Sequence, residues 1–152
     1  MSKDATLRIP AGTDPVQVLL KAHLDQLALC DRLEEIADSL PDQINRQKCI
    51  YAALALGPMI RGLHKFEEDV VFPLIAAQNA GDELTAKTLT RLKFEHCEDE
   101  CFAEELIEAL HDLGAGRAAI NMEATGYMLR GFFEALRRHI AFENELLLRW
   151  RG

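Results

Sequence analysis

Six ionisable side chains stand in the apolar stripes of the sequence, where a protein core normally has none. They are His23, His64, His96, His139, Glu68 and Glu143. Burying such groups is costly unless they pair with one another or bind a metal ion. Glu68 and Glu143 each follow a histidine by four residues, so each pair lies one turn apart on one helix face. Imidazoles and carboxylates in this pattern predict a metal site.

Gly and Pro residues divide the chain into four long segments that we predict to be helices. The segments are residues 14–39, 42–79 and 82–114, and a fourth that starts between 117 and 121 and ends near 149. Apolar residues recur in them at steps of three and four. Asp14 suits an N-cap with Pro15 at the first helical position, and Asp82 suits an N-cap after Gly81. Pro58 predicts a kink or a break. The predicted fold is all-α, an up-down-up-down four-helix bundle.

The histidines are spaced so that all four are predicted to lie at one level of this bundle. For each consecutive pair, the midpoint in the sequence falls at or beside a predicted turn, at Pro41-Asp42, Ala80-Gly81 and Gly114-Ala115-Gly116. Antiparallel helices rise equally on both sides of a turn, by about 1.5 Å per residue. Any one of these histidines alone would be explained as a hydrogen-bonded core residue, but scattered core histidines have no reason to share a level.

The two halves of the chain supply matching sets of ligands, each with two imidazoles and one carboxylate. This arrangement suits two metal ions. Six mixed nitrogen and oxygen ligands fit iron or manganese better than structural zinc, which prefers four ligands. If both carboxylates bridge the ions, an oxide or hydroxide bridge completes five ligands per metal and leaves a position for a small exogenous molecule.

Other ionisable residues near the histidines are alternative ligands. Glu67, Asp99 and Glu100 could replace or supplement the two glutamates, although solvated or supporting groups are the preferred interpretation. His111 lies 15 residues after His96 on the same predicted helix. That separation is about 22 Å, so we interpret His111 as a surface or helix-end residue.

The chain has four cysteines, Cys30, Cys49, Cys97 and Cys101. We expect reduced thiols, because a chain with an ample core and no export signal does not need disulfides. Cys97 and Cys101 share a face of the third helix beside His96, and we interpret them as small buried or boundary residues. The alternative is a redox-sensitive pair or a zinc site, but the acidic neighbours disfavour a thiolate there.

Length and charge exclude several classes of function. The 152 residues suffice for one domain, predicted over residues 14–152 after a tail of residues 1–13. A net charge of −8 argues against nucleic-acid and anionic-membrane partners, which attract basic surfaces. No apolar run approaches the roughly 20 residues of a membrane helix, and residues 1–13 lack the apolar core of a secretory signal. We therefore expect a cytoplasmic protein.

Three stretches make the chain resemble the hemerythrin-like family, also called HHE cation-binding domains. They are residues 64–73 (HKFEEDVVFP), 95–96 (EH) and 139–145 (HIAFENE), and the resemblance covers nearly the whole chain after Asp14. It implies a four-helix bundle with two iron ions in a non-heme centre. The ligands that it implies are His23 and His64 for one iron, His96 and His139 for the other, and Glu68 and Glu143 as bridges.

Two positions depart from the oxygen-carrying members of this family. Those members have a second histidine where this chain has Leu92, and an aspartate where it has Asn144. The set of four histidines and two glutamates resembles instead the di-iron proteins linked to repair of iron–sulfur clusters under nitrosative stress. It is also similar to the iron- and oxygen-sensing hemerythrin-like domain of an F-box protein.

Two classes of function follow from the resemblance. In the first, the protein binds or senses a small species (O2, NO or iron itself) and acts through a protein partner or as a homo-oligomer. In the second, it is an enzyme-like protein that reduces O2, peroxide or NO, or supplies iron for cluster repair. A structural bundle without metal is the third alternative. Reversible spectral change without turnover distinguishes the first class from the second.

Overall fold

The computed structural model describes residues 12–117 and 119–151, and every regular element in these residues is helical. The elements are α1 (Pro15–Ser39), α2 (Arg46–Phe66), the π-helix η1 (Glu67–Val71), α3 (Phe72–Gln78), α4 (Glu83–Ala115) and α5 (Met122–Arg151). The predicted all-α class and the four long helical segments are confirmed. The predicted tail of residues 1–13 lies, except for its last two residues, outside the described part of the chain.

Polar side chains begin each long helix, because the first N–H groups of a helix have no partner within it. In each case an Asp or Asn oxygen accepts a hydrogen bond from a backbone N–H two or three residues later. The bonds are Asp14 with Val16 (3.0 Å), Asn45 with Lys48 (3.1 Å), Asp82 with Leu84 (3.1 Å) and Asn121 with Ala124 (3.0 Å). The caps predicted at Asp14 and Asp82 are therefore confirmed.

The second segment is not broken at Pro58, where the sequence predicted a kink or a break. Helix α2 continues through this proline. Leu56 and Ile60, on either side of it, are fully buried, so core packing holds the helix together there. The departure from α-helical geometry comes later, where the Phe72 N–H donates to the carbonyl of Glu67 five residues before. Pro73 has no N–H to donate, and the wider π turn lies directly before it.

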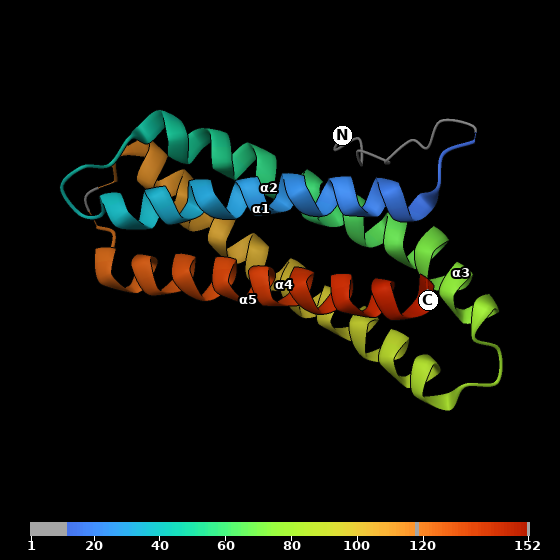
Figure 1. The fold of residues 1–152 in the computed structure, drawn as a ribbon. Coiled ribbons are helices and arrows are strands. Elements are labelled where there is room, and N and C mark those ends of the chain that lie inside the picture. The colour runs from blue at the N-terminus through green and yellow to red at the C-terminus, as the bar shows by residue number, and fades with distance from the viewer. Residues whose placement is uncertain (1–11, 118, 152) are drawn as a thin grey trace.

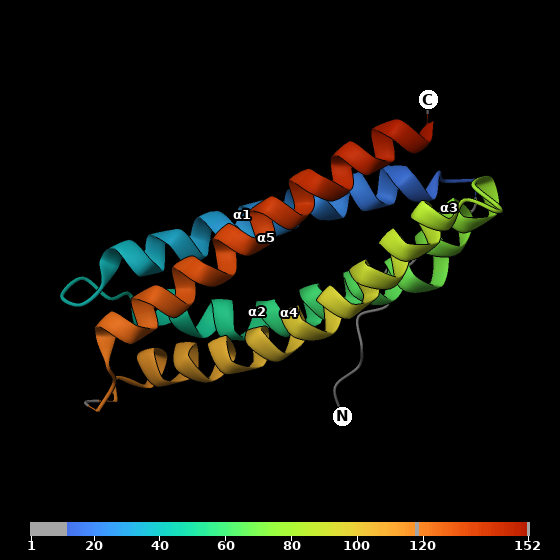
Figure 2. The same cartoon turned by 90° about the horizontal axis from the view of Figure 1, so that it is seen from below.

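The four long helices pack as a bundle in which successive helices run in opposite directions (Figures 1 and 2). The short helices η1 and α3 extend α2 at one end of it. Helix α2 packs mainly against α4, and α1 packs mainly against α5. The two views agree that α1 and α5 lie side by side, although they are far apart in the sequence. The predicted up-down-up-down bundle is confirmed.

The core consists of two apolar clusters, one toward each end of the bundle. The first includes Leu33, Leu56, Leu106, Leu110 and Phe133, all at most 1% exposed. The second includes Leu19, Leu63, Phe66, Phe72 and Leu92. Along every long helix, the predicted ligand histidine falls at the junction of the two clusters. The apolar clusters therefore enclose the candidate site from both ends.

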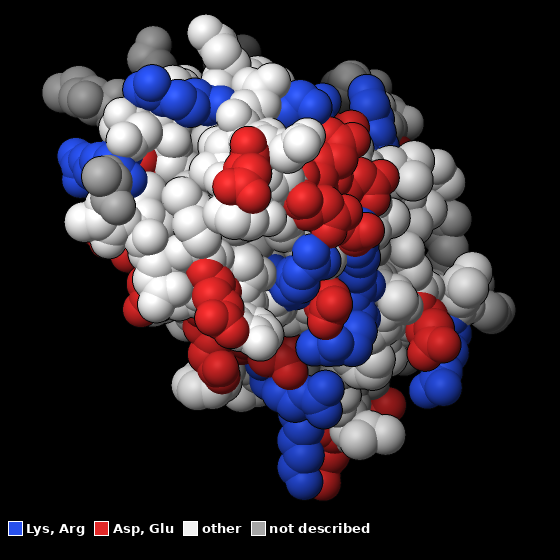
Figure 3. All heavy atoms as spheres, turned by 90° about the vertical axis from the view of Figure 1, so that its left-hand side faces the viewer, with Lys and Arg blue, Asp and Glu red and all other residues white. Residues whose placement is uncertain are grey.

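The surface carries charges of both signs. Figure 3 shows acidic and basic side chains interspersed over the end of the bundle that carries the α1–α2 turn. On the surface, Arg130 forms an ion pair with Asp38 at 2.7 Å. Within the described residues, no helix is long and apolar enough to cross a membrane.

Candidate metal centre

Three of the four predicted histidines are in direct ring contact at the centre of the bundle. His64 of α2 stacks on His96 of α4, with ring centroids 3.8 Å apart and planes 7° from parallel. The ring of His139 of α5 lies 5.9 Å from that of His96, centroid to centroid. His64 and His96 are almost fully buried, and the side chain of His139 is 12% exposed. The helices therefore bring these residues to one level, as the turn positions predicted.

Glu143 of α5 connects this group to His23 of α1. Its Oε2 lies 2.9 Å from Nε2 of His23, and its Oε1 lies 2.9 Å from Nε2 of His139. Burial alone would raise the pKa of Glu143. Hydrogen bonds from His139, His23 and Glu67 outweigh burial and hold that pKa well below its usual value. Each carboxylate oxygen thus faces a different imidazole, which is the arrangement that a bridge between two cations requires.

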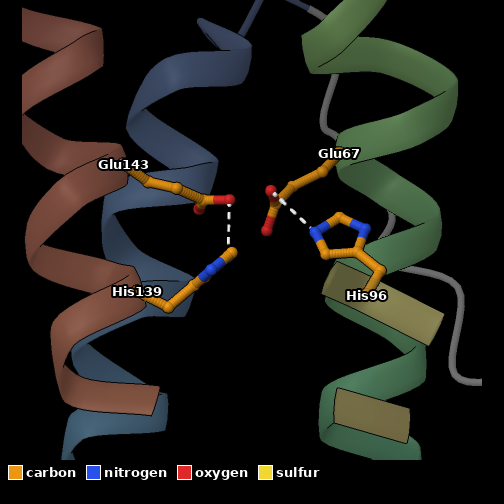
Figure 4. Close-up of side chains that lie close together, drawn as sticks. All are labelled: Glu67, His96, His139 and Glu143. Atoms are coloured by element: carbon orange, nitrogen blue, oxygen red, sulfur yellow. Dashed lines mark hydrogen bonds and ion pairs between the residues drawn. The ribbon is translucent and has the colours of Figure 1, made fainter. Parts of the chain in front are cut away.

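The second carboxyl group inside the cluster is that of Glu67, the first residue of η1. Glu67 is 1% exposed and points at Glu143 across the centre (Figure 4). Its Oε2 lies 3.5 Å from Nε2 of His96. One ligand atom from each of Glu67, His96, His139 and Glu143 lies within 4.8 Å of the other three. Burial and the charge of Glu143 raise the pKa of Glu67 well above its usual value, so without metal the protonated Glu67 donates a hydrogen bond to the Glu143 carboxylate.

Glu68, the bridge implied by the family resemblance, lies on the outer side of His96. Its Oε2 is 3.4 Å from Nδ1 of His96, and its side chain is 37% exposed. Glu67 was an open alternative in the sequence, and the structure places it where Glu68 was expected.

The rotation of α2 in the bundle explains which glutamate faces inward. Glu67 follows Ile60 by seven residues and Leu63 by four, and both of these side chains are buried in the core. Seven- and four-residue steps keep a side chain on one helix face, whereas the next residue turns away by about 100°. His64 lies at the edge of this face, so the residue four positions after it leaves the core. In the sequence, the spacing of Glu67 from Ile60 and Leu63 therefore indicated the inward glutamate better than the four-residue step from His64 did.

Each of the four histidines at the centre has a side-chain oxygen within 3.5 Å of its Nδ1 atom. The pairs are His23 with Asn144 (2.8 Å), His64 with Glu100 (3.4 Å), His96 with Glu68 (3.4 Å) and His139 with Glu95 (3.5 Å). Histidines that bind metals commonly have such an oxygen partner, which orients the ring and directs the other nitrogen at the metal. Asn144, which stands where the oxygen carriers have an aspartate, provides this oxygen partner for His23.

The electrostatics keep His64 and His96 available as ligands. Burial, assisted by the neighbouring His96 and His139, lowers the pKa of His64 to about 3. Burial also lowers the pKa of His96. Both rings are therefore neutral near pH 7, and a neutral ring has the lone pair that a metal needs. For His139, burial lowers the pKa, but the hydrogen bond and charge of Glu143 outweigh it and raise that pKa overall.

Leu92 is fully buried and faces the acidic pair. It lines a cavity of about 10 Å³ together with Glu67 and Glu143, and the rest of the lining is apolar. A space of this size holds about one water molecule. The position that carries a further histidine in the oxygen carriers thus contributes an apolar wall to this centre.

The remaining candidates lie outside the cluster. Asp99 lines a surface pocket that also includes His139, and burial raises the pKa of Asp99 to about 6. His111 is exposed on α4. Cys97 and Cys101 are exposed free thiols, so their interpretation as buried or boundary residues is wrong. They lie on the outward side of α4, because His96 and the apolar residues of that helix occupy its inner side.

Two observations indicate that the histidine nitrogens and glutamate oxygens of the cluster can bind metal ions. Two buried atoms of the cluster that face each other, Glu67 Oε2 and His96 Nε2, have no hydrogen bond from the described residues. Leaving such atoms unpaired is costly, and a cation would pair with carboxylate oxygens and imidazole nitrogens together. Two ligand atoms at right angles on one cation lie about 3 Å apart when each bond to the cation is about 2.1 Å long. The N···O distances of 2.9 Å from Glu143 to His23 and to His139 agree with this separation.

Comparison with known proteins agrees with this geometry. The family model for the hemerythrin HHE cation binding domain matches residues 14–150. No curated protein and no solved structure matches the chain. The match covers all four long helices and every residue of the cluster. The chain therefore belongs to the hemerythrin HHE cation-binding domain family.

Proposed function

We propose that the cluster binds two iron ions and that the protein uses them to bind or sense a small species, O2 or NO. The observation that carries this proposal is the position of Glu143, with one oxygen 2.9 Å from His23 and the other 2.9 Å from His139. A single structural cation would need only one of these two contacts between a Glu143 oxygen and a histidine. A carboxylate held between imidazoles of two helices supports a two-metal centre.

We assign the ligands to the six inward side chains. They are His23, His64, His96, His139, Glu143 and Glu67. Glu67 takes the role that the sequence predicted for Glu68, because it is buried opposite Glu143 whereas Glu68 is partly exposed. Glu68 then orients His96 through the contact at Nδ1. Mixed nitrogen and oxygen ligands favour iron or manganese over structural zinc.

The iron ions would supply redox chemistry and open positions for a small ligand. The protein contributes a dry, apolar surrounding. Phe72 stacks on His96 with ring centroids 5.6 Å apart, and Leu92 closes the cavity beside the acidic pair. This apolar wall leaves room for about one small molecule, and it favours neutral diatomic molecules over ions.

Metal analysis after expression in iron-replete medium tests the proposal first. We expect about two iron ions per chain, and well under one would refute the di-iron centre. Anaerobic reduction followed by separate exposure to O2 and NO then tests the function by absorption spectroscopy. A reversible change without turnover supports binding or sensing, and sustained consumption of either gas with a reductant would assign a reductase instead. The proposal includes a cytoplasmic location, which suits reduced iron and the four free thiols.

A further inference from the structure

Among the six proposed ligands, His139 is the most accessible to solvent. The other five are at most 4% exposed, whereas the side chain of His139 is 12% exposed. A cation that enters a folded protein exchanges its water molecules for protein atoms one after another, so the first ligand must be accessible from outside. His139 is the proposed ligand that meets this condition.

His139 lines a pocket of about 340 Å³ between α4 and α5. Helix α4 packs mainly against α2, and α5 packs mainly against α1, which leaves space on the α4–α5 side of the bundle. A water molecule takes about 30 Å³ in the liquid, so a cation with about six waters fits in this pocket. The remaining lining residues are Arg91, Glu95 and Asp99 of α4 and Ala135, Arg138 and Phe142 of α5.

The carboxylates of this pocket are less exposed than its arginines. Glu95 is 3.5 Å from Nδ1 of His139, and it also pairs with the 64% exposed Arg91 at 3.1 Å. Arg138 is exposed, so solvent screens its charge strongly. Asp99 is half-buried and has no hydrogen bond or ion pair with a described residue. The carboxylate of Asp99 is therefore the group in this pocket that is available to attract a cation.

We propose that the α4–α5 pocket is the route by which divalent iron enters the centre, with Asp99 attracting the hydrated ion and His139 as its first protein ligand. Glu143 lies on the inner side of the His139 ring, with Oε1 2.9 Å from Nε2. One imidazole thus separates the pocket from the buried carboxylates, and rotation of this side chain opens the path between them. The inference rests on the proposed function for the identity of the metal.

Asp99→Asn tests the attraction of the cation, and Glu98→Gln, at the exposed neighbouring position, is the matched control because it removes the same charge outside the pocket. The probe is Co2+, which takes the same nitrogen and oxygen ligands and absorbs visible light when bound. At low ionic strength, metal-free Asp99→Asn should take up as much Co2+ as the wild type but about tenfold more slowly in stopped-flow measurements. This is the attraction of a divalent ion to one carboxylate about 6 Å away in water. At about 1 M salt the difference should nearly vanish, because the Debye length falls to about 3 Å.

Ala135→Leu tests the route itself, because the larger side chain narrows the pocket. Ala141→Leu, at an exposed position on the same helix outside the pocket lining, is its control. Ala135→Leu should slow Co2+ uptake at every salt concentration, with an unchanged final Co2+ content and circular dichroism spectrum.

Modification with diethyl pyrocarbonate tests the opening without metal. In the metal-free wild type, mass spectrometry should find His139 modified more slowly than the exposed His111 but faster than the buried His23, His64 and His96. Ala135→Leu should slow the modification of His139 and leave that of His111 unchanged.

Three results would overturn the inference. They are Co2+ uptake by Asp99→Asn and Ala135→Leu at the rates of their controls, modification of His139 no faster than that of the buried histidines, and a reduced Co2+ content in Asp99→Asn, which would make Asp99 a ligand of the centre. Unchanged uptake rates with full loading would refute the route alone. A wild type that takes up neither Co2+ nor iron would refute the proposed di-iron centre and the route with it.

Discussion

Replacing Glu67 with glutamine is expected to stabilise the metal-free protein and to weaken its metal binding. Burial, aided by the charge of Glu143, raises the pKa of Glu67 well above its ordinary value of 4.5. Glu67 therefore stays protonated in the folded protein over a pH range in which the unfolded chain has already released this proton. Keeping the proton costs about 1.4 kcal/mol for each pH unit of that range. Glutamine retains a donor toward Glu143 without this cost.

The gain from Glu67→Gln should have a defined pH dependence. With the pKa raised in the folded state, the folded protein binds more protons than the unfolded chain above pH 4.5, so this group lowers stability as the pH rises. The variant lacks this effect. Its advantage in free energy of unfolding should be near zero at about pH 4.5 and should grow as the pH rises toward neutral, by about 1.4 kcal/mol for each pH unit over which folded wild type keeps the proton.

Urea unfolding of the metal-free proteins at several pH values, followed by circular dichroism, measures this difference. Glu68→Gln is the matched control, because its partly exposed side chain contacts only His96 among the cluster histidines. Its effect should stay within about 1 kcal/mol at every pH. A gain in Glu67→Gln that is absent, or equal at acidic and neutral pH, would refute the shared proton. After iron loading, Glu67→Gln should hold less iron than Glu68→Gln, and the reverse order would restore Glu68 as the bridge.

Three further outcomes are expected. His139→Ala should lose iron and its near-ultraviolet absorption, whereas His111→Ala, at an exposed position, should keep both; iron loss from the latter would contradict the common level of the ligands. Leu92→His places an imidazole against the acidic pair and should change the visible spectrum or the lifetime of an NO adduct, so an unchanged spectrum and lifetime would place this residue away from the metals. At about pH 8, Cys97 should react rapidly with a thiol reagent, whereas Cys30, whose pKa burial raises to about 11, should react only on unfolding; equal rates would show that the core opens readily.

The bundle could be predicted from the sequence because its signals are local. Apolar residues at steps of three and four, capping residues such as Asp14 and Asp82, and Gly or Pro at the turns each act within one or two helical turns. The histidine level also followed from the sequence, because helices rise by a constant amount per residue. The sequence predicted a kink or a break at Pro58, and the break is absent, because Leu56 and Ile60 pack in the core on either side of the proline.

The sequence by itself determined the fold class, the family and the histidines that meet in the core. Only the tertiary structure decided which of Glu67 and Glu68 is buried in the cluster, because the two differ by one residue and by about 100° around the helix axis. Their local sequence permits either to face inward, and the rotation of α2 depends on how its apolar residues pack against α1 and α4. The same packing brings Glu143 between imidazoles of α1 and α5 and leaves His139 at the α4–α5 pocket. These are contacts between distant segments, which no local pattern encodes.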